Sequence, residues 1–186
     1  MKEKGWFVHD PLWDERVEII KQYYNPDGKI LDMGCGNGYV LDRLKGEKTA
    51  LDFSDDELKA CSMYKTIRHD LNMPLKTNVK YDTILYLDVL EHLINPEQAI
   101  QTAVEHLKSR GLFIVSVPYF GKLKELVAAS LFWDTVFHYT EWHVRFFSVN
   151  TFKEILENNH FKIVKLYKLG RWWPLYMDML AVCKLK

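Results

Sequence analysis

One short run, residues 30–38, constrains the fold of this 186-residue chain more than any other feature. An apolar stretch leads to the acid Asp32, glycines follow at positions 34, 36 and 38, and residues 39–44 are typical of the opening of a helix. Glycines at a strand-to-helix turn let the backbone adopt positive φ angles and let a ligand approach without a Cβ atom in the way. The run therefore predicts a strand, a ligand-binding turn and a helix.

The spacing of the glycines narrows the choice of ligand. A dinucleotide-binding GxGxxG turn would need a third glycine at position 39 or 41, where the chain has Tyr39 and Leu41. A triphosphate-binding loop would end in Gly-Lys-Ser or Gly-Lys-Thr, and this run does not. The pattern therefore disfavours a nicotinamide-dependent oxidoreductase and gives no support to a triphosphate-binding enzyme.

Four acids lie at or just beyond the ends of predicted strands: Asp32, Asp52, Asp70 and Asp88. In a doubly wound sheet the carboxyl ends of the strands form one rim, and ligands bind there near the switch in strand order. Asp52 follows Asp32 by 20 residues, and an acid at that place can accept hydrogen bonds from both ribose hydroxyls of a nucleoside. A rim with four acids suits a cationic ligand that carries a nucleoside.

Strand and helix patterns alternate along the whole chain. We expect helices at residues 11–24, 39–44, 54–63, 96–108 and 148–158, and strands at residues 30–32, 49–52, 67–70, 112–117, 161–167 and 180–185, with another strand beginning near residue 81. This alternation predicts an α/β fold with a doubly wound sheet. We expect a single domain over residues 1–186, with an N-terminal helix within residues 1–25 and an insert at residues 119–147.

Composition and charge agree with a single cytosolic domain. Lys plus Arg equals Asp plus Glu, 25 each, so no bulk positive charge points to a nucleic-acid partner. The three cysteines lack a CxxC spacing and are typical of reduced thiols rather than of a disulfide framework or a zinc site. We expect no transmembrane segment and no signal peptide, because no apolar run approaches ~20 residues.

Together the motifs resemble those of the class I S-adenosylmethionine-dependent methyltransferases, and the resemblance covers about residues 25–186. Residues 32–38 resemble the family's motif I, and residues 81–93 resemble its fourth-strand motif. Residues 107–118 resemble its fifth strand together with the end of the preceding helix. Residues 143–148 resemble a late motif of the small-molecule subfamily that includes quinone-biosynthesis O-methyltransferases. The resemblance implies a Rossmann-like, mostly parallel seven-stranded sheet with helices on both faces and an antiparallel last strand. It also implies S-adenosyl-L-methionine as cofactor and an O, N or C atom of a small metabolite as methyl acceptor.

The resemblance also assigns cofactor contacts. Gly34, Gly36 and Gly38 would line the methionine and ribose portion of the cofactor, and Asp32 would lie near its ammonium group. Asp52 would bind the ribose hydroxyls, while Asp70 and the backbone of Leu71 would contact adenine. Asp88 and Val89 would border the amino-acid end, and Cys35 and Phe53 are the remaining predicted contacts. Simpler roles stay open for three of these residues. Asp52 could cap the helix that follows it, Asp70 could belong to an ordinary loop, and Cys35 could be a small packing residue.

Catalysis and acceptor binding have fewer signals. A general base is needed only when the nucleophile arrives protonated, and the candidates are His92, His143, Glu91 and Glu141, of which we favour the two histidines. A structural role is the alternative for each histidine. His143 and Arg145 would lie on one side of an extended segment and suit an anionic or phenolic acceptor. Tyr119 and Trp142 are further candidate acceptor contacts, and no metal site is expected, because the spacing of His138 and His143 fits no HExxH helix.

The insert at residues 119–147 is rich in aromatic and aliphatic residues. One interpretation is a lid over an apolar acceptor pocket, and the other is a helix that lies on a membrane surface without crossing it. We favour the lid, because the apolar stripe is short and carries few basic residues. The sequence leaves the oligomeric state open, and it leaves as an alternative function a non-catalytic S-adenosylmethionine-binding protein that acts through a partner.

Overall fold

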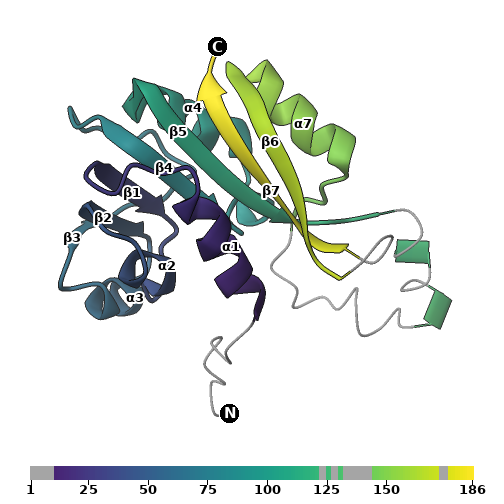
Figure 1. Ribbon diagram of the computed structural model, residues 1–186, viewed down its shortest axis with the longest axis horizontal. Coiled ribbons are helices and arrows are strands. Elements are labelled where there is room, and N and C mark those ends of the chain that lie inside the picture. Colours follow the sequence, from purple (N-terminus) through teal and green to yellow (C-terminus); the bar gives the residue numbers. More distant parts are fainter. Residues whose placement is uncertain (1–10, 122–124, 127–129, 132–143, 172–175) are drawn as a thin grey trace.

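The computed structural model describes residues 11–121, 125–126, 130–131, 144–171 and 176–186. In these residues a seven-stranded sheet of order β3-β2-β1-β4-β5-β7-β6 forms the middle layer (Figure 1). The strands are β1 (Lys29–Met33), β2 (Glu47–Asp52), β3 (Lys65–Arg68), β4 (Tyr81–Leu87), β5 (Leu107–Pro118), β6 (Phe161–Gly170) and β7 (Tyr176–Leu185). The pairs among β1 to β5 are parallel, whereas β7 runs antiparallel to both β5 and β6. The expected mostly parallel sheet with an antiparallel last strand is confirmed.

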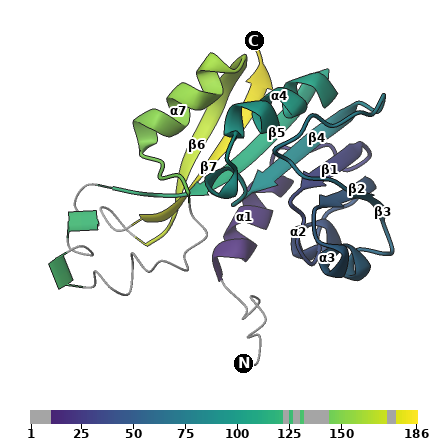
Figure 2. The same cartoon turned by 180° about the vertical axis from the view of Figure 1, so that it is seen from behind.

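Helices cover both faces of the sheet, as Figures 1 and 2 show from opposite sides. Helices α1 (Pro11–Lys21), α2 (Tyr39–Asp42) and α3 (Asp55–Ala60) pack on one face, and α4 (Pro96–His106) and α7 (Val149–Asn158) pack on the other. Each face has its own buried apolar cluster, to which α1 contributes Val17 and Ile20 and α7 contributes Phe152 and Leu156. Burial on both faces explains the nearly continuous apolar stretch of β5.

Helix starts follow the capping chemistry of the sequence. Ser54 Oγ accepts a hydrogen bond from Glu57 N at the start of α3, and Asn95 Oδ1 accepts one from Gln98 N at the start of α4, with Pro96 in the first turn. Ser148 and Thr151 form a capping box at the start of α7. Asp10, which precedes Pro11 and is of a residue type typical of a helix N-cap, lies outside the described residues.

Several predicted element ends are wrong. Helices α1, α2 and α3 end at Lys21, Asp42 and Ala60, two or three residues before the predicted ends. Bonds of the tighter i to i+3 type close the last turns, such as Leu44 N to Leu41 O. Strand β3 ends before Asp70, so Asp70 lies in the following loop instead of at a strand end.

The fifth strand is longer than the sequence predicts. Strand β5 begins at Leu107, although a helix to residue 108 and a turn before residue 112 are expected. Leu107 pairs with Tyr81, and a register shift between Tyr81 and Thr83 accommodates the extra residues on β5. Pairing with β4 therefore overrides the local turn pattern, since the strand can continue through a bulge.

The strand order reverses between β1 and β4, and the carboxyl ends of these strands point to the same rim. This is the switch point at which open α/β sheets bind their ligands. The 3₁₀ helix η1 (Leu90–His92) follows β4 at this rim. Within the described ranges, no helix is both long enough and apolar enough to cross a membrane.

Candidate active site

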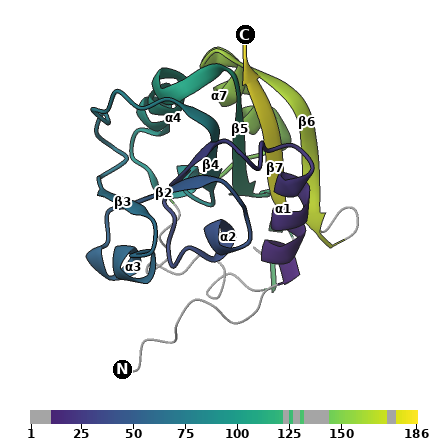
Figure 3. The ribbon, with the colours of Figure 1, turned by 60° about the vertical axis from the view of Figure 1, so that its left-hand side comes forward.

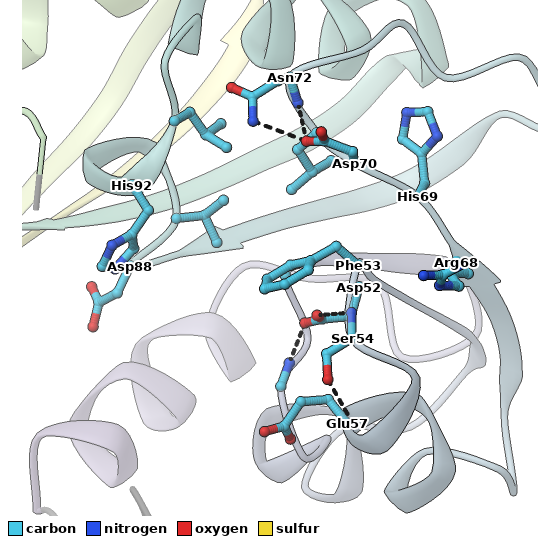
Figure 4. Close-up of a pocket in the computed structure, with 15 residues that line it drawn as sticks. Asp52, Phe53, Ser54, Glu57, Arg68, His69, Asp70, Asn72, Asp88 and His92 are labelled. Atoms are coloured by element: carbon cyan, nitrogen blue, oxygen red, sulfur yellow. Dashed lines mark hydrogen bonds between the residues drawn. The ribbon is translucent and has the colours of Figure 1, made fainter. Parts of the chain in front are cut away.

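A cavity of about 1050 Å³ opens at the switch point, over the carboxyl ends of β1, β2, β3 and β4 (Figure 4). Its lining includes residues that the sequence predicts, namely Gly34, Gly36, Asp52, Phe53, Asp70, Leu71, Asp88, Val89 and His92. The rest of the lining is formed by Ser54, Glu57, Arg68, His69, Asn72 and Leu93. A concave site with an apolar wall and a few converging polar groups is typical of a ligand pocket.

The glycine turn is held between β2 and the loop after β4. Gly34 has φ +82° and Gly38 has φ +81°, conformations that L side chains rarely adopt. A Cβ atom on Gly34 would lie 2.5 Å from Val89 Cγ2, and one on Gly38 would lie 2.8 Å from Cys61 Sγ. The amides of Gly34 and Cys35 donate to Leu51 O at 2.7 and 3.0 Å. Both the backbone angle and the available space therefore demand glycine at position 34.

Asp52 ties this turn to the end of β2. Its Oδ2 accepts a hydrogen bond from Gly36 N at 3.1 Å, and its Oδ1 accepts one from Ser54 N at 2.9 Å. The helix cap itself is Ser54, so capping of α3 does not account for Asp52. A carboxylate has about four acceptor positions. Two are used by backbone amides, and Asp52 has acceptor capacity left where it lines the cavity.

Asp32, Cys35 and Gly38 are not part of the cavity lining, and Asp32 and Cys35 are buried. Burial, followed by the nearby charge of Asp52, raises the pKa of Asp32 to about 7. Cys35 Sγ lies 3.8 Å from Cys61 Sγ, both thiols are buried, and burial raises the pKa of each. These surroundings match the packing role that the sequence leaves open for Cys35.

The loop after β3 is organised by the carboxylate of Asp70 and the side-chain amide of Asn72. Asp70 Oδ1 accepts from the backbone N and from Nδ2 of Asn72, both at 2.9 Å, and these bonds lower the pKa of Asp70. Asn72 Oδ1 in turn accepts from Ile94 N at 2.9 Å, which joins this loop to the segment after η1. Asn72 thus connects two walls of the cavity (Figure 4).

The wall near Asp88 contains charges that sequence reasoning missed. Asp88 has φ +54°, its Oδ1 accepts from Ser116 Oγ at 2.8 Å, and its Oδ2 lies 2.6 Å from an Arg16 nitrogen. The same Arg16 nitrogen lies 2.7 Å from Asp178 Oδ2. Side chains of Arg16 and Asp178 are only 2% and 1% exposed, whereas that of Asp88 is 26% exposed. Arg16 therefore joins the cavity wall to a fully buried acid.

Glu91 is a second fully buried acid at this wall. Among the described residues, neither of its carboxyl oxygens has a hydrogen-bond partner, and Oδ1 of Asp178 has none either. Burial, followed by the charge of Asp88, raises the pKa of Glu91 and the pKa of Asp178. His92 Nε2 lies 3.8 Å from Glu91 Oε1, and His92 lines the cavity. His92 is therefore the neighbour that lies between a buried carboxyl group and the ligand space.

Candidate acceptor contacts are less well placed. Arg145 Nε donates to Leu93 O at 3.0 Å and its second nitrogen contacts Ile94 O, so the guanidinium holds the loop after η1 and does not line the cavity. Backbone carbonyls hold two of the guanidinium's five donors, and a contact between Arg145 and the acceptor stays a prediction. Tyr119 also lies outside the lining, and its backbone N donates to Met177 O.

Trp142, His143, His138 and Glu141 lie outside the described residues. In the part of the chain that the structure does describe, no group of three or more His, Cys, Asp or Glu side chains is placed to hold a metal ion.

Some of the missed residues carry a local signal. Ser54 and Glu57 form an S-x-x-E pattern, which predicts a helix start directly after Asp52. Asp178 is a charged residue within an otherwise apolar segment, which indicates a partnered charge but does not identify the partner, whereas Arg16 lies among other charged residues and carries no such signal. Their contact joins positions 162 residues apart, so only the fold reveals it.

Comparison with known proteins defines the class. Residues 9–166 match the family model described as "Methyltransferase domain". A ubiquinone biosynthesis O-methyltransferase of Rickettsia typhi is 29% identical over 184 residues, covering 88% of this chain and 74% of the relative. The chain therefore belongs to this methyltransferase family.

Solved structures agree at the level of the fold. The 1,6-didemethyltoxoflavin-N1-methyltransferase of Burkholderia thailandensis, solved with its substrate and S-adenosylhomocysteine, superposes with a TM-score of 0.76 at 14% identity, covering 96% of this chain and 80% of that one. The [4+2]-cyclase SpnF superposes with a TM-score of 0.72 at 13% identity, covering 92% and 81%. The fold alone thus admits other reactions. With the family match, we describe the protein as an S-adenosylmethionine-dependent methyltransferase with a small-molecule acceptor.

Proposed function

We propose that this protein transfers a methyl group from S-adenosylmethionine to a hydroxyl oxygen of a small, partly apolar molecule. The observation that carries the proposal is the cavity at the switch point (Figure 4). On one side of the cavity lies the glycine turn, which is held by hydrogen bonds to Leu51 O and Asp52, and on the other side lie Asp88 and His92. Oxygen as the accepting atom is supported by the relative from Rickettsia typhi, whose name describes an O-methyltransferase.

The described residues fit this cofactor. Gly34 and Gly36 leave backbone exposed to the cavity, and Asp52 has acceptor positions for ribose hydroxyls. We assign Asp70 and Leu71 to the adenine side, because the Asn72 bonds hold that loop against the opposite wall. When bound, S-adenosylmethionine supplies an electrophilic methyl group on a sulfonium. Asp88 and Val89 would border its amino-acid end.

The chain's own contribution to transfer is orientation, exclusion of water and removal of a proton. A hydroxyl is a weak nucleophile until it loses its proton, and a base within hydrogen-bond reach lowers this barrier. His92 is the histidine that lines the cavity beside Asp88, so we assign it as general base. Leu93, Val89 and Phe53 supply apolar wall on which a partly apolar acceptor would rest.

The remaining sequence predictions are part of the same proposal. We infer that residues 119–147 form a lid over the acceptor, with Trp142 and His143 as contacts. We also infer that the protein works in the cytoplasm, which is supported by three buried, free cysteines.

Calorimetric titration with S-adenosylmethionine, S-adenosylhomocysteine and NAD tests the cofactor assignment. We expect both sulfur ligands to bind and NAD not to bind. Asp52→Ala should weaken binding at least about tenfold, because it removes a carboxylate with two charge-assisted bonds. The matched control Asp56→Ala, whose side chain is 90% exposed on α3, should bind like the wild type.

Mass-spectrometric screening of phenols, carboxylates and amines for methylation tests the acceptor. A phenol that is methylated by the wild type and at least about a hundredfold more slowly by His92→Ala would support the assigned base. Cofactor binding without turnover of any acceptor would favour the alternative of a non-catalytic binding protein. If neither S-adenosylmethionine nor S-adenosylhomocysteine binds, the proposal as a whole is contradicted.

A further inference from the structure

The buried wall behind Asp88 combines three carboxyl groups with one guanidinium group. Arg16 comes from α1, Asp88 follows β4, Glu91 and His92 belong to η1, and Asp178 belongs to β7. Figure 3 shows α1 beside β7, the arrangement that brings Arg16 to Asp178. Strand β5 contributes the uncharged Ser116. If all three acids were ionised, this wall would hold more negative than positive charge out of water.

Such a charge excess is costly inside a protein. Arg16 is shared by Asp88 and Asp178, so it has no contact with Glu91 as close as a salt bridge among the described residues. Both oxygens of Glu91 are buried, and neither has a hydrogen-bond partner in the part of the chain that the structure describes. An isolated buried carboxylate avoids this cost by holding its proton. The directions of the pKa shifts agree, since the pKa values of Glu91 and Asp178 are both raised by burial and then by the charge of Asp88.

We propose that Glu91 carries a proton in the free enzyme, releases it when the cationic cofactor binds, and regains a proton from the acceptor through His92. This inference rests on the proposed function. A positive sulfonium in the cavity supplies the charge that would balance an ionised Glu91, because electrostatic coupling is strong in a poorly solvated wall. His92, at 3.8 Å from Glu91 and in the cavity lining, is the connection between the two.

The transfer step then balances in atoms and charge. The acceptor oxygen forms the new bond to carbon, and the pair of the breaking carbon–sulfur bond goes to sulfur, which becomes a neutral thioether. The O–H pair stays on oxygen, and the proton moves to His92 and on to Glu91. One positive charge disappears at sulfur while one negative charge disappears at Glu91, so the site has the same net charge before and after. Glu91 acts through His92 and is therefore a positioning residue.

Proton release on binding provides a direct test that does not depend on turnover. Titration of the full chain in buffers with different ionisation enthalpies, near pH 7.5, measures how many protons leave when each ligand binds. When it binds to the wild type, S-adenosylmethionine should cause the release of about one proton more than S-adenosylhomocysteine, which lacks the positive sulfonium. We call this difference the excess. Glu91→Gln should bind both ligands but lose most of this excess. Because the ligands' own amino groups titrate equally with both proteins, the difference between wild type and variant isolates Glu91.

Two control variants sharpen the test. Glu97→Gln, which removes an exposed acid on α4, is the neutral control and should keep the excess; Asp32→Asn removes another buried acid with a raised pKa and tests whether the released proton comes from Asp32 instead of Glu91. An excess that survives in Glu91→Gln, or that disappears in Asp32→Asn instead, would overturn the proposal. Equal proton release with both ligands from the wild type would do so too.

Folding and cofactor binding are checked separately. If circular dichroism shows that Glu91→Gln does not fold, Asp178→Asn takes its place. That variant removes a negative neighbour of Glu91, so Glu91 should lose its proton more readily before binding, and the excess should shrink; an undiminished excess would overturn the proposal. Failure of both sulfur ligands to bind the wild type would contradict the proposed function instead.

Discussion

The two sides of the cavity hold their acids in different ways. On the side of the glycine turn, Asp52 and Asp70 accept bonds from nearby backbone amides, and Asn72 links two loops. On the side of Asp88, three acids and Arg16 come from distant elements, and buried oxygens of Glu91 and Asp178 have no hydrogen-bond partner among the described residues. Local backbone amides thus support the acids of the first side, whereas the second side depends on contacts between distant elements and has buried oxygens that a proton can satisfy.

The largest effect should come from breaking the ion pair of the second side. Arg16→Met removes the cation from two acids and leaves charge uncompensated in a buried wall, so it should lower the free energy of unfolding by about 3 to 5 kcal/mol. Urea denaturation measures this. Asp178→Asn, which leaves Arg16 with Asp88, should cost much less. A loss below about 1 kcal/mol in Arg16→Met would mean that the pair is not buried as described.

The glycine turn should be nearly as sensitive. Gly34→Ala forces a side chain into φ +82° and places Cβ 2.5 Å from Val89 Cγ2, so it should cost about 2 to 4 kcal/mol and weaken cofactor binding more than about tenfold. Thermal unfolding and calorimetry measure the two effects. Gly46→Ala, at φ +107° and away from the cavity, is the control that strains the backbone without altering the site. Loss of binding in both variants alike would show that strain alone is responsible.

The buried acid Glu91 should make the free energy of unfolding depend on pH. The pKa of Glu91 is raised from 4.5 to about 9 in the folded protein, so the native state keeps this proton when the unfolded chain has lost it. The stability that this group contributes is complete below about pH 4, where the unfolded chain is protonated too, and declines as the pH rises toward the raised pKa of the folded state. Glu91→Gln has no such proton to lose, so its stability relative to the wild type should rise with pH. Denaturation midpoints that differ by the same amount at about pH 5 and about pH 8 would contradict this.

The smallest effect should come from the partly exposed amide on the first side. Asn72→Ala removes the bonds to Asp70 and to Ile94 N, each worth about 1 kcal/mol or less, and should weaken S-adenosylmethionine binding about fivefold with little change in stability. The exposed Asn158→Ala on α7 is the control. A change as large as that of Asp52→Ala would place Asn72 in direct contact with the cofactor.

Local chemistry explains which features the sequence predicts well. The glycine spacing and the acids after the strands depend on neighbours a few residues away, and the structure places Gly34, Asp52, Asp70 and Asp88 around one cavity. Helix caps at Ser54 and Asn95 are local too. Element ends and the bulge at the start of β5 depend on pairing with another strand, so the predictions there are wrong by several residues.

The sequence by itself determined the α/β alternation, the sharp turn of residues 30–38 and the acids that follow the strands, while the resemblance of its motifs to a known family predicted the cofactor and the antiparallel last strand. Only the tertiary structure decided that Asp32 is buried, that Arg145 holds a loop, and that the second wall is charged. Arg16 and Asp178 meet across 162 residues because α1 packs next to β7. No local pattern encodes such a contact, since it exists only once the sheet has brought both elements to one rim.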